Sequence, residues 1–264
     1  MQSTNEILSA ACDFLCSTTD NETNKIEIHD GENIILATTP SYSMGGIVHR
    51  PTGIKKIEES LRTIDIRDLP MVIPSDGDNS KKKRMQRSVG VAAMNLLSAS
   101  QIDWKTGDPM SGLAGNVEEV GMVGLFTPTL HRFSDSTIRV IERTESKRKK
   151  IPDRHSHVQA YSPAEAEEAF CGVDIVFITG STCIYGGLGR YLSEISKQST
   201  VVLIGPTSSF IPDPIFDAGV DIVAGSVVTD PEAIAAEIDN DVCATDLYGE
   251  GLQKVYVEND SKVK

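Results

Sequence analysis

Short, continuous apolar runs and segments with helical spacing of apolar residues follow one another along the second half of the chain. Short runs rich in Val and Ile recur there, at 118–126, 136–143, 172–180, 199–206 and 219–226. Helical spacing of apolar residues follows most of them, at 127–133, 163–170, 182–197, 212–217 and 230–238. Continuous apolar strands that alternate with helices are typical of a parallel sheet covered on both faces. The pattern therefore predicts an α/β fold class, with a Rossmann-like parallel-sheet domain over 117–264.

Residues 1–100 show a different pattern, which predicts a smaller α+β domain. An alternating run at 25–30 is followed across Asp30-Gly31-Glu32 by the run 33–39, and the pair predicts a hairpin. The other expected elements are a helix at 4–17, a strand or crossing loop at 42–50, short helices at 54–62 and 64–71, a polar turn at 76–84 and a long helix at 85–100. Residues 101–116 hold Gly, Pro, Asp and Asn with little periodicity, so we expect a linker there.

Charge and cysteine content narrow the function classes. The 264 residues carry a net charge of −13, which argues against a nucleic-acid partner or an anionic membrane, because both attract basic surfaces. Five widely spaced cysteines do not resemble a disulfide framework, and neither a signal peptide nor a membrane-spanning apolar run is evident. We expect a cytoplasmic protein with a small-molecule ligand, and the sequence leaves open whether it forms a homo-oligomer.

The ends of the predicted strands are the first place to look for a site, because open parallel sheets bind ligands beyond the carboxyl ends of their strands. The first end, "VGMVGLFTP", has Gly124 but lacks the G-x-G-x-x-G spacing of dinucleotide sites, which argues against NAD or FAD. Glu142 ends the second strand. A carboxylate there is placed to accept hydrogen bonds from a ribose diol, as in S-adenosylmethionine, or is a solvated partner of Arg139 or Arg143.

Two further strand ends are rich in hydroxyls and glycine. The first loop holds Thr179, Gly180, Ser181 and Thr182, and the second holds Gly205, Pro206, Thr207 and Ser208. Backbone N–H groups and hydroxyls at a helix N-terminus form an anion site, although Ser and Thr in one such loop also serve as helix caps. Because both loops face one sheet edge, we predict that they bind ligand together with Glu142.

Cysteine and histidine offer weaker candidates. Cys183 lies inside the first loop, but no Cys-x-x-Cys pair or neighbouring His supports it as a metal ligand or nucleophile. We expect a small buried residue there, with backbone amides contacting the ligand. Cys12 and Cys16 share a helix face and are expected in the core. The basic, polar segment 145–157, which holds His155 and His157, is expected to be a solvated loop. No residue receives a catalytic role.

Several segments resemble a known family. The runs "VGMVGLFTP", "VIER", "DIVFITGSTCIYGGL" and "VVLIGPTSSFIPDPIFDAGVDIVAGSVVTDPE" together resemble DUF364, a Rossmann-like family labelled for heavy-metal chelation. The runs "SVGVAAMNLLSA" and "NIILATT" resemble its companion N-terminal domain, DUF4213, which has an enolase-N-terminal-like α+β fold.

The resemblance also implies site residues. It places the family's acidic residue of strand two on Glu142, its Thr-Gly loop on Thr179 and Gly180, and its Gly-Pro loop on 205–207. The family usually has Asn-Gly where this chain has Tyr185 and Gly186, which implies a different ligand if that position contacts it.

The resemblance implies a protein that binds or processes a small metal-chelating metabolite in the crevice between two domains. A heavy-metal ion or S-adenosylmethionine is then the candidate cofactor. Two alternatives stay open. One is a transferase that uses S-adenosylmethionine or a nucleotide, with Glu142 on the ribose. The other is a regulatory module that binds a small molecule without chemistry. The sequence does not decide whether the protein is an enzyme.

Overall fold

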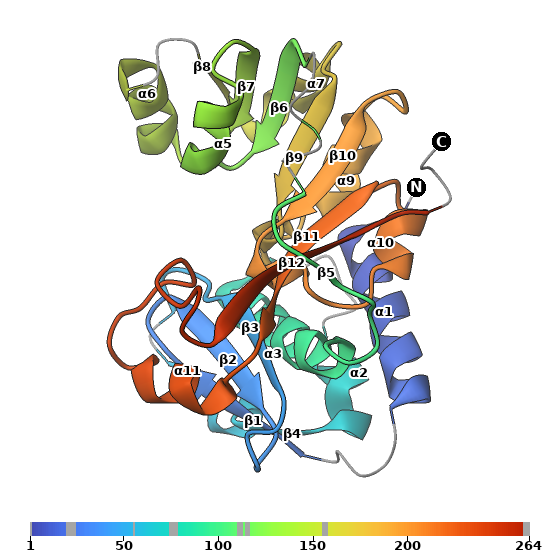
Figure 1. Cartoon of the computed structure of the whole chain (residues 1–264), viewed down its shortest axis with the longest axis vertical. Helices are drawn as coiled ribbons and strands as arrows, with labels where there is room; N and C mark the ends of the chain where they lie inside the picture. Colours follow the sequence, from blue (N-terminus) through green and yellow to red (C-terminus); the bar gives the residue numbers. More distant parts are fainter. Residues whose placement is uncertain are drawn as a thin grey trace.

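The two sheets predicted from the sequence are both present in the computed structural model (Figure 1). The structure describes residues 2–19, 25–54, 56–73, 79–109, 113, 117–154 and 158–260. The N-terminal part contains a small antiparallel sheet, and the C-terminal part contains a larger, mostly parallel sheet.

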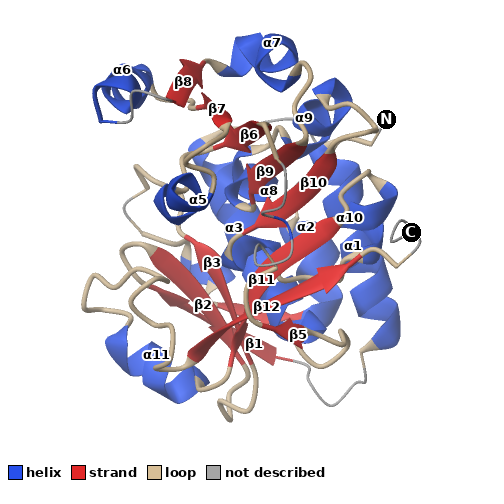
Figure 2. Ribbon diagram, turned by 45° about the horizontal axis from the view of Figure 1, so that its top comes forward, coloured by secondary structure: helices blue, strands red, loops and turns tan. Residues whose placement is uncertain are grey.

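The N-terminal part is a four-stranded sheet of order β3-β2-β1-β4. Its elements are α1 (Thr4–Thr18), β1 (Lys25–Asp30), β2 (Ile34–Thr38), β3 (Gly45–His49), η1 (Glu59–Leu61), β4 (Thr63–Asp65), η2 (Ile66–Asp68), α2 (Leu69–Val72) and α3 (Lys81–Ser98). Strand β2 is buried on both faces. Ile35 and Ala37 join the core with α1 and α3, whereas Ile34 and Leu36 pack against α11 (Pro231–Glu237), which lies beside β2 in Figure 2.

The segment between β3 and α3 differs from the sequence prediction. Instead of short helices at 54–62 and 64–71, it contains strand β4, flanked by 3-10 turns and the short helix α2. Ile64 pairs with Ile26, so β4 covers an edge of β1 that would otherwise leave backbone groups unpaired. Helix α3 begins at Lys81 because Ser80 caps it. The predicted polar turn at 76–84 lies partly outside the described residues.

The C-terminal part is an eight-stranded sheet of order β5-β12-β11-β10-β9-β6-β7-β8. Its strands are β5 (Lys105–Thr106), β6 (Glu119–Val123), β7 (Thr137–Ile141), β8 (Val158–Tyr161), β9 (Ile175–Thr179), β10 (Thr200–Ile204), β11 (Ile222–Val228) and β12 (Leu252–Glu258). Its helices are α5 (Thr127–Arg132), α6 (Glu145–Arg154), η3 (Pro163–Glu165), α7 (Ala166–Phe170), α8 (Ser181–Tyr185), α9 (Leu188–Glu194), η4 (Pro206–Ser208), α10 (Asp213–Asp217) and α11.

This strand order confirms the predicted Rossmann-like α/β fold. The strands from β8 to β11 are parallel, whereas β12 and β5 add an antiparallel edge. Taken in chain order, the parallel strands have the arrangement 3-2-1-4-5-6 of dinucleotide-binding folds. The direction of winding reverses between β6 and β9, so the carboxyl ends of these strands border the crevice where such folds bind ligands.

Some elements of this half were not predicted. Residues 145–154, expected as a solvated loop, form α6, and the expected linker contains β5, which pairs with β12. The expected helix at 182–197 is divided into α8 and α9. Gly186 and Gly187 separate them with φ values of 75° and 103°, a left-handed conformation that residues with side chains rarely adopt. His155 and His157 lie outside the described residues.

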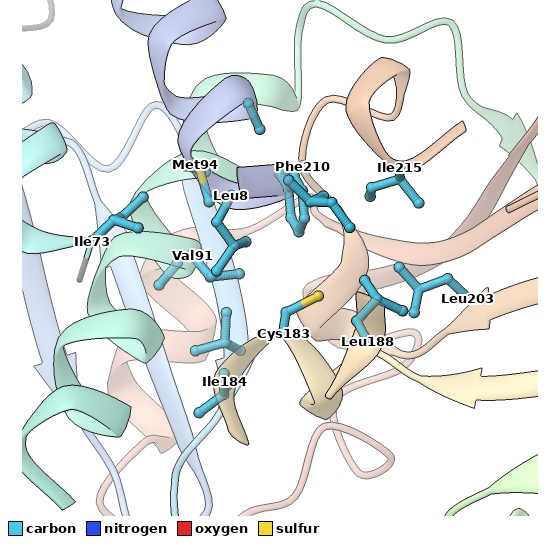
Figure 3. Packing of buried hydrophobic residues seen from close by; sticks show 14 of the residues in the cluster. Leu8, Ile73, Val91, Met94, Cys183, Ile184, Leu188, Leu203, Phe210 and Ile215 are labelled. Carbon is cyan, nitrogen blue, oxygen red and sulfur yellow. The ribbon is translucent and has the colours of Figure 1, made fainter. Parts of the chain in front are cut away.

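One hydrophobic core runs through both parts. Leu8 of α1 and Val91 of α3 belong to the same cluster as Cys183 of α8 and Leu203 of β10, as Figure 3 shows. Apolar packing therefore fixes the two sheets relative to each other. Within the described residues, no helix is long and apolar enough to cross a membrane.

We expect Gly46→Ala to destabilise the protein strongly. A β-carbon at Gly46 would lie 2.3 Å from both the Ala92 carbonyl oxygen and the Leu96 backbone nitrogen of α3. Overpacking costs about 1–3 kcal/mol, and helix backbone yields less readily than a side chain. Urea unfolding measures the loss. Gly121→Ala is the matched control, because its nearest neighbour is a Phe170 ring carbon at 3.1 Å. Equal losses in the two variants would contradict the expectation.

Candidate functional site

A pocket of about 770 Å³ lies where the carboxyl ends of β6, β7 and β9 face the N-terminal part. Gly124, Glu142 and Thr179 line it from these three strand ends. The N-terminal part contributes Ser3, Thr4, Asn5, His49, Thr52, Asn79, Arg84 and Arg87. The pocket thus occupies the switch point of the sheet, and its volume suits a small molecule.

The charge of the pocket is opposite to that of the whole protein. Its described lining residues include five cationic side chains, Arg84, Arg87, Arg143, Lys147 and Arg190. Glu142 is the single carboxylate among the described lining residues, although the whole protein has a net charge of −13. A concave wall lined with one sign of charge concentrates ligands of the opposite sign. The site therefore favours an anionic ligand.

The aromatic ring of Tyr185 contacts the guanidinium groups of two of these arginines. The guanidinium carbon of Arg143 lies 4.0 Å from the centre of the Tyr185 ring, and that of Arg84 lies 5.4 Å away. The Tyr185 hydroxyl accepts a hydrogen bond from the Thr52 backbone N–H at 3.1 Å. Burial raises the pKa of Tyr185, but hydrogen bonds from Thr52 and Arg143 outweigh it, so the pKa is lowered overall.

The start of α3 holds the end of α8 in place. Arg87, which is 2% exposed, donates to the Ile184 carbonyl oxygen at 2.7 Å. The Asn79 amide donates to the Tyr185 carbonyl oxygen at 2.5 Å, and its own oxygen accepts from Arg84 at 3.0 Å. These bonds satisfy carbonyl groups at the end of a short helix. Residues of the N-terminal part thereby fix the wall that the Rossmann-like part presents to the pocket.

His49 brings a nitrogen donor to this cationic site. It ends β3, and its backbone N–H donates to the Thr207 hydroxyl at 3.1 Å. Burial lowers the pKa of the imidazole below its usual 6.5, and the charges of Lys147 and Arg143 lower it further. The ring is therefore neutral at pH 7, the form that accepts a proton or binds a metal ion.

Four of the predicted ligand residues line the pocket, namely Glu142, Thr179, Ser181 and Thr182. Glu142 accepts a hydrogen bond from the Thr144 backbone N–H at 3.0 Å, and Thr182 donates to the Thr179 carbonyl oxygen at 2.7 Å.

Gly180 and the second predicted loop occupy a different place. The Gly180 N–H donates to the Ile204 carbonyl oxygen, and a β-carbon at Gly180 would lie 2.9 Å from the Ser208 backbone nitrogen. Gly205, Pro206, Thr207 and Ser208 are not among the described lining residues, and η4 packs against β3, α3 and α8. Their role in binding stays a prediction.

Cys183 lies in the core. It is 0% exposed, and Figure 3 shows it among Ile184, Leu188 and their apolar neighbours. The Sγ atoms of Cys12 and Cys16 lie 4.0 Å apart. The Cys16 thiol also donates a hydrogen bond to the Ile66 carbonyl oxygen. In the part of the chain that the structure describes, no three His, Cys, Asp or Glu side chains form a group that could hold a metal ion.

Sequence reasoning missed the cations of the pocket. Arg84, Lys147 and Arg190 were not proposed as ligand residues, and Arg143 was considered only as a partner of Glu142. A usable signal was present, because the basic runs 81–84 and 147–150 stand out in an acidic chain. Nothing in the sequence showed that the helices carrying these runs border one pocket.

The comparisons with known proteins agree on family and fold. The model of the DUF364 family, described as "Putative heavy-metal chelation", matches residues 113–256. A crystal structure of a DUF364 protein of unknown function from Pyrococcus horikoshii has a TM-score of 0.73 and 20% identity, covering 96% of this chain and 100% of that one. Another from Desulfitobacterium hafniense has a TM-score of 0.70 and 18% identity, covering 96% and 98%. At such identities the likeness shows the fold alone. No curated protein matches the chain.

Thiol labelling should follow burial. Cys171 and Cys243 are exposed and should react with iodoacetamide in the native protein. Cys183 and Cys12 should react only after unfolding, because burial raises the pKa of Cys183 to about 12 and also raises that of Cys12. Mass spectrometry of digests made before and after unfolding in urea locates the labels. Rapid labelling of Cys183 in the native protein would show that the thiol is accessible and reactive.

Stability should fall on mild acidification. Because the pKa of His49 is lowered in the folded state, the unfolded chain binds a proton that the folded chain resists below about pH 6.5. We expect the free energy of unfolding to fall between about pH 7.5 and 5.5 and the fall to be smaller in His49→Gln. Urea unfolding at both pH values tests this. Part of the fall should persist, because burial also lowers the pKa of His29. An unchanged slope in His49→Gln would contradict the expectation.

Proposed function

The chain belongs to the DUF364 family, whose model matches more than half of its residues, and we propose that it binds a small, anionic, metal-chelating metabolite in the pocket between its two sheets. The observation that carries this proposal is the excess of arginine and lysine over carboxylate in the pocket wall. The metabolite is either carried or processed there.

The positive charge of the pocket is compatible with the family's description as a heavy-metal chelation family, if the ligand is the chelator and not the bare metal ion. Two like unit charges 4 Å apart repel by about 1 kcal/mol in water and by about 4 kcal/mol near a protein surface. A bare metal cation among Arg84, Arg143 and Lys147 meets this repulsion from several sides. A chelator with several negative groups is attracted instead, and it brings its own donor atoms to the metal. The protein then recognises the chelator, while the neutral His49 imidazole is available to a metal that it carries.

The proposal extends to the N-terminal part and the location of the protein. We assign 1–100 to a DUF4213-like, enolase-N-terminal-like domain, supported by its four-stranded antiparallel sheet and its covering helices. We assign the protein to the cytoplasm, supported by its five free cysteines.

One observation favours a second candidate, a transferase that uses S-adenosylmethionine or a nucleotide. Glu142 lines the pocket directly after β7, the second strand of the 3-2-1-4-5-6 order. An acidic residue at that place binds the ribose diol in many Rossmann folds. The charge balance of the pocket argues against S-adenosylmethionine, which carries a sulfonium cation, but it does not argue against a nucleotide, whose phosphates are anionic.

Glu142→Gln separates the proposed function from the use of S-adenosylmethionine, because the two predict changes of opposite sign. For citrate, used as an anionic chelator, removing a negative charge should tighten binding about fivefold, or roughly 1 kcal/mol. For S-adenosylmethionine, losing a charged hydrogen-bond acceptor should weaken binding about tenfold or more. Isothermal titration calorimetry of the wild type and the variant, with each compound and with the Ni²⁺ complex of citrate, gives both answers.

Glu232→Gln is the matched control, because it removes the same charge from α11, outside the described pocket lining. Its affinity for citrate should equal that of the wild type. If the wild type binds neither citrate nor its metal complex, the proposed function is wrong. If it binds S-adenosylmethionine and Glu142→Gln weakens that binding, the second candidate replaces it.

A further inference from the structure

Tyr185 occupies a special place in the pocket, because it contacts residues that come from both parts of the protein. Arg84 belongs to α3 of the N-terminal part, and Arg143 follows β7 of the Rossmann-like part. Their guanidinium carbons lie 5.4 and 4.0 Å from the centre of the same Tyr185 ring. Two arginines that are distant in sequence thus contact the same aromatic ring.

Tyr185 is itself held at both its hydroxyl and its backbone. The Thr52 N–H donates to the Tyr185 hydroxyl at 3.1 Å, and the Asn79 amide donates to the Tyr185 carbonyl oxygen at 2.5 Å. Gly186, with a φ of 75°, follows directly and ends α8. The ring therefore has little freedom to move away from the arginines, and a cation that stacks on a fixed ring is itself restricted.

Two guanidinium groups that contact one ring repel each other, which has an electrostatic cost. The electron-rich face of the ring offsets part of it, typically about 0.5–2 kcal/mol for a cation. The remaining repulsion is relieved when negative charge enters the pocket. A single carboxylate can form a bidentate pair with only one guanidinium, whereas a ligand with two anionic groups can pair with both.

We propose that Tyr185 is a positioning residue that holds Arg84 and Arg143 as a pair, and that this pair selects ligands with at least two anionic groups over those with one. The inference rests on the proposed function, because it concerns the same pocket and names the class of chelator that the pocket accepts. The ligand class is a di- or tricarboxylate or a molecule with an equivalent pair of anionic groups.

The first experiment measures selectivity by calorimetry with citrate, succinate and acetate. The wild type should bind citrate and succinate at least tenfold more tightly than acetate, a difference of about 1.4 kcal/mol. Tyr185→Leu should weaken citrate binding about tenfold and leave acetate binding nearly unchanged, so the selectivity falls. Tyr185→Phe keeps the ring and should retain most of the selectivity, which separates ring stacking from the hydroxyl contacts with Thr52 and Arg143.

Tyr256→Leu is the matched control. Tyr256 also lies under a cation, with the Lys105 nitrogen 5.8 Å from its ring centre, but it lies on β12, outside the described pocket lining. This variant should keep the wild-type affinity for all three probes. Thermal unfolding of each variant shows whether a loss of binding reflects a loss of folded protein.

A double-mutant cycle tests whether Tyr185 acts through Arg143. If it does, Tyr185→Leu should have much less effect on citrate affinity in the Arg143→Ala background than in the wild type. Fully additive effects would overturn the positioning role. Equal affinity of the wild type for succinate and acetate would overturn the proposed selectivity while leaving an anionic site intact. Failure of the wild type to bind any of the three probes would overturn this inference, and failure to bind the Ni²⁺ complex of citrate as well would overturn the proposed function.

Discussion

Helix α3 is buried at every residue from Arg87 to Ser98, so the polar side chains of this stretch must find partners inside the protein. Arg87 donates to the Ile184 carbonyl oxygen after β9, and Asn95 donates to the Pro206 carbonyl oxygen after β10. Leaving such buried groups unpaired costs about 1–3 kcal/mol each. The bonds of one helix therefore decide which loops of the Rossmann-like sheet meet the N-terminal part. They also leave the ends of β6, β7 and β9 as the borders of the pocket.

The sequence predicted those elements whose apolar pattern is set by burial on both faces. The runs that became β6, β7, β9, β10 and β11 are central strands and are mostly apolar. The strands β4, β5, β8 and β12 lie at or near sheet edges, where mixed polar residues weaken the pattern. What makes them strands is a partner distant in the chain, as when Lys105 pairs with Tyr256. Local spacing carries no information about such a partner.

The residues of the candidate site were also only partly predictable from the sequence, because one residue type can serve binding or packing. Hydroxyl-rich loops predicted a ligand, but hydroxyls and backbone N–H groups also join one part of a protein to another. Thr207 accepts a hydrogen bond from the His49 backbone N–H, a contact between the two parts. Thr179 and Ser181, which have the same residue types at the next strand end, line the pocket. Arg84 and Lys147 belong to basic runs that are typical of solvated helices. Only the packing of α3 against α8 and of α6 against β8 distinguishes a lining residue from a surface one.

The positive side chains that line the pocket repel one another, and the rest of the fold keeps them in place. Among the described residues that line it there are five cations and one carboxylate, and contacts with Tyr185, Asn79 and Glu142 offset part of the repulsion. Because one continuous core fixes the two sheets, the arginines cannot separate by opening the crevice without exposing apolar surface. An anion that enters therefore removes a strain already present in the folded state rather than inducing a new arrangement. Binding and stability are then linked, since a ligand that binds only the folded state raises its free energy of unfolding.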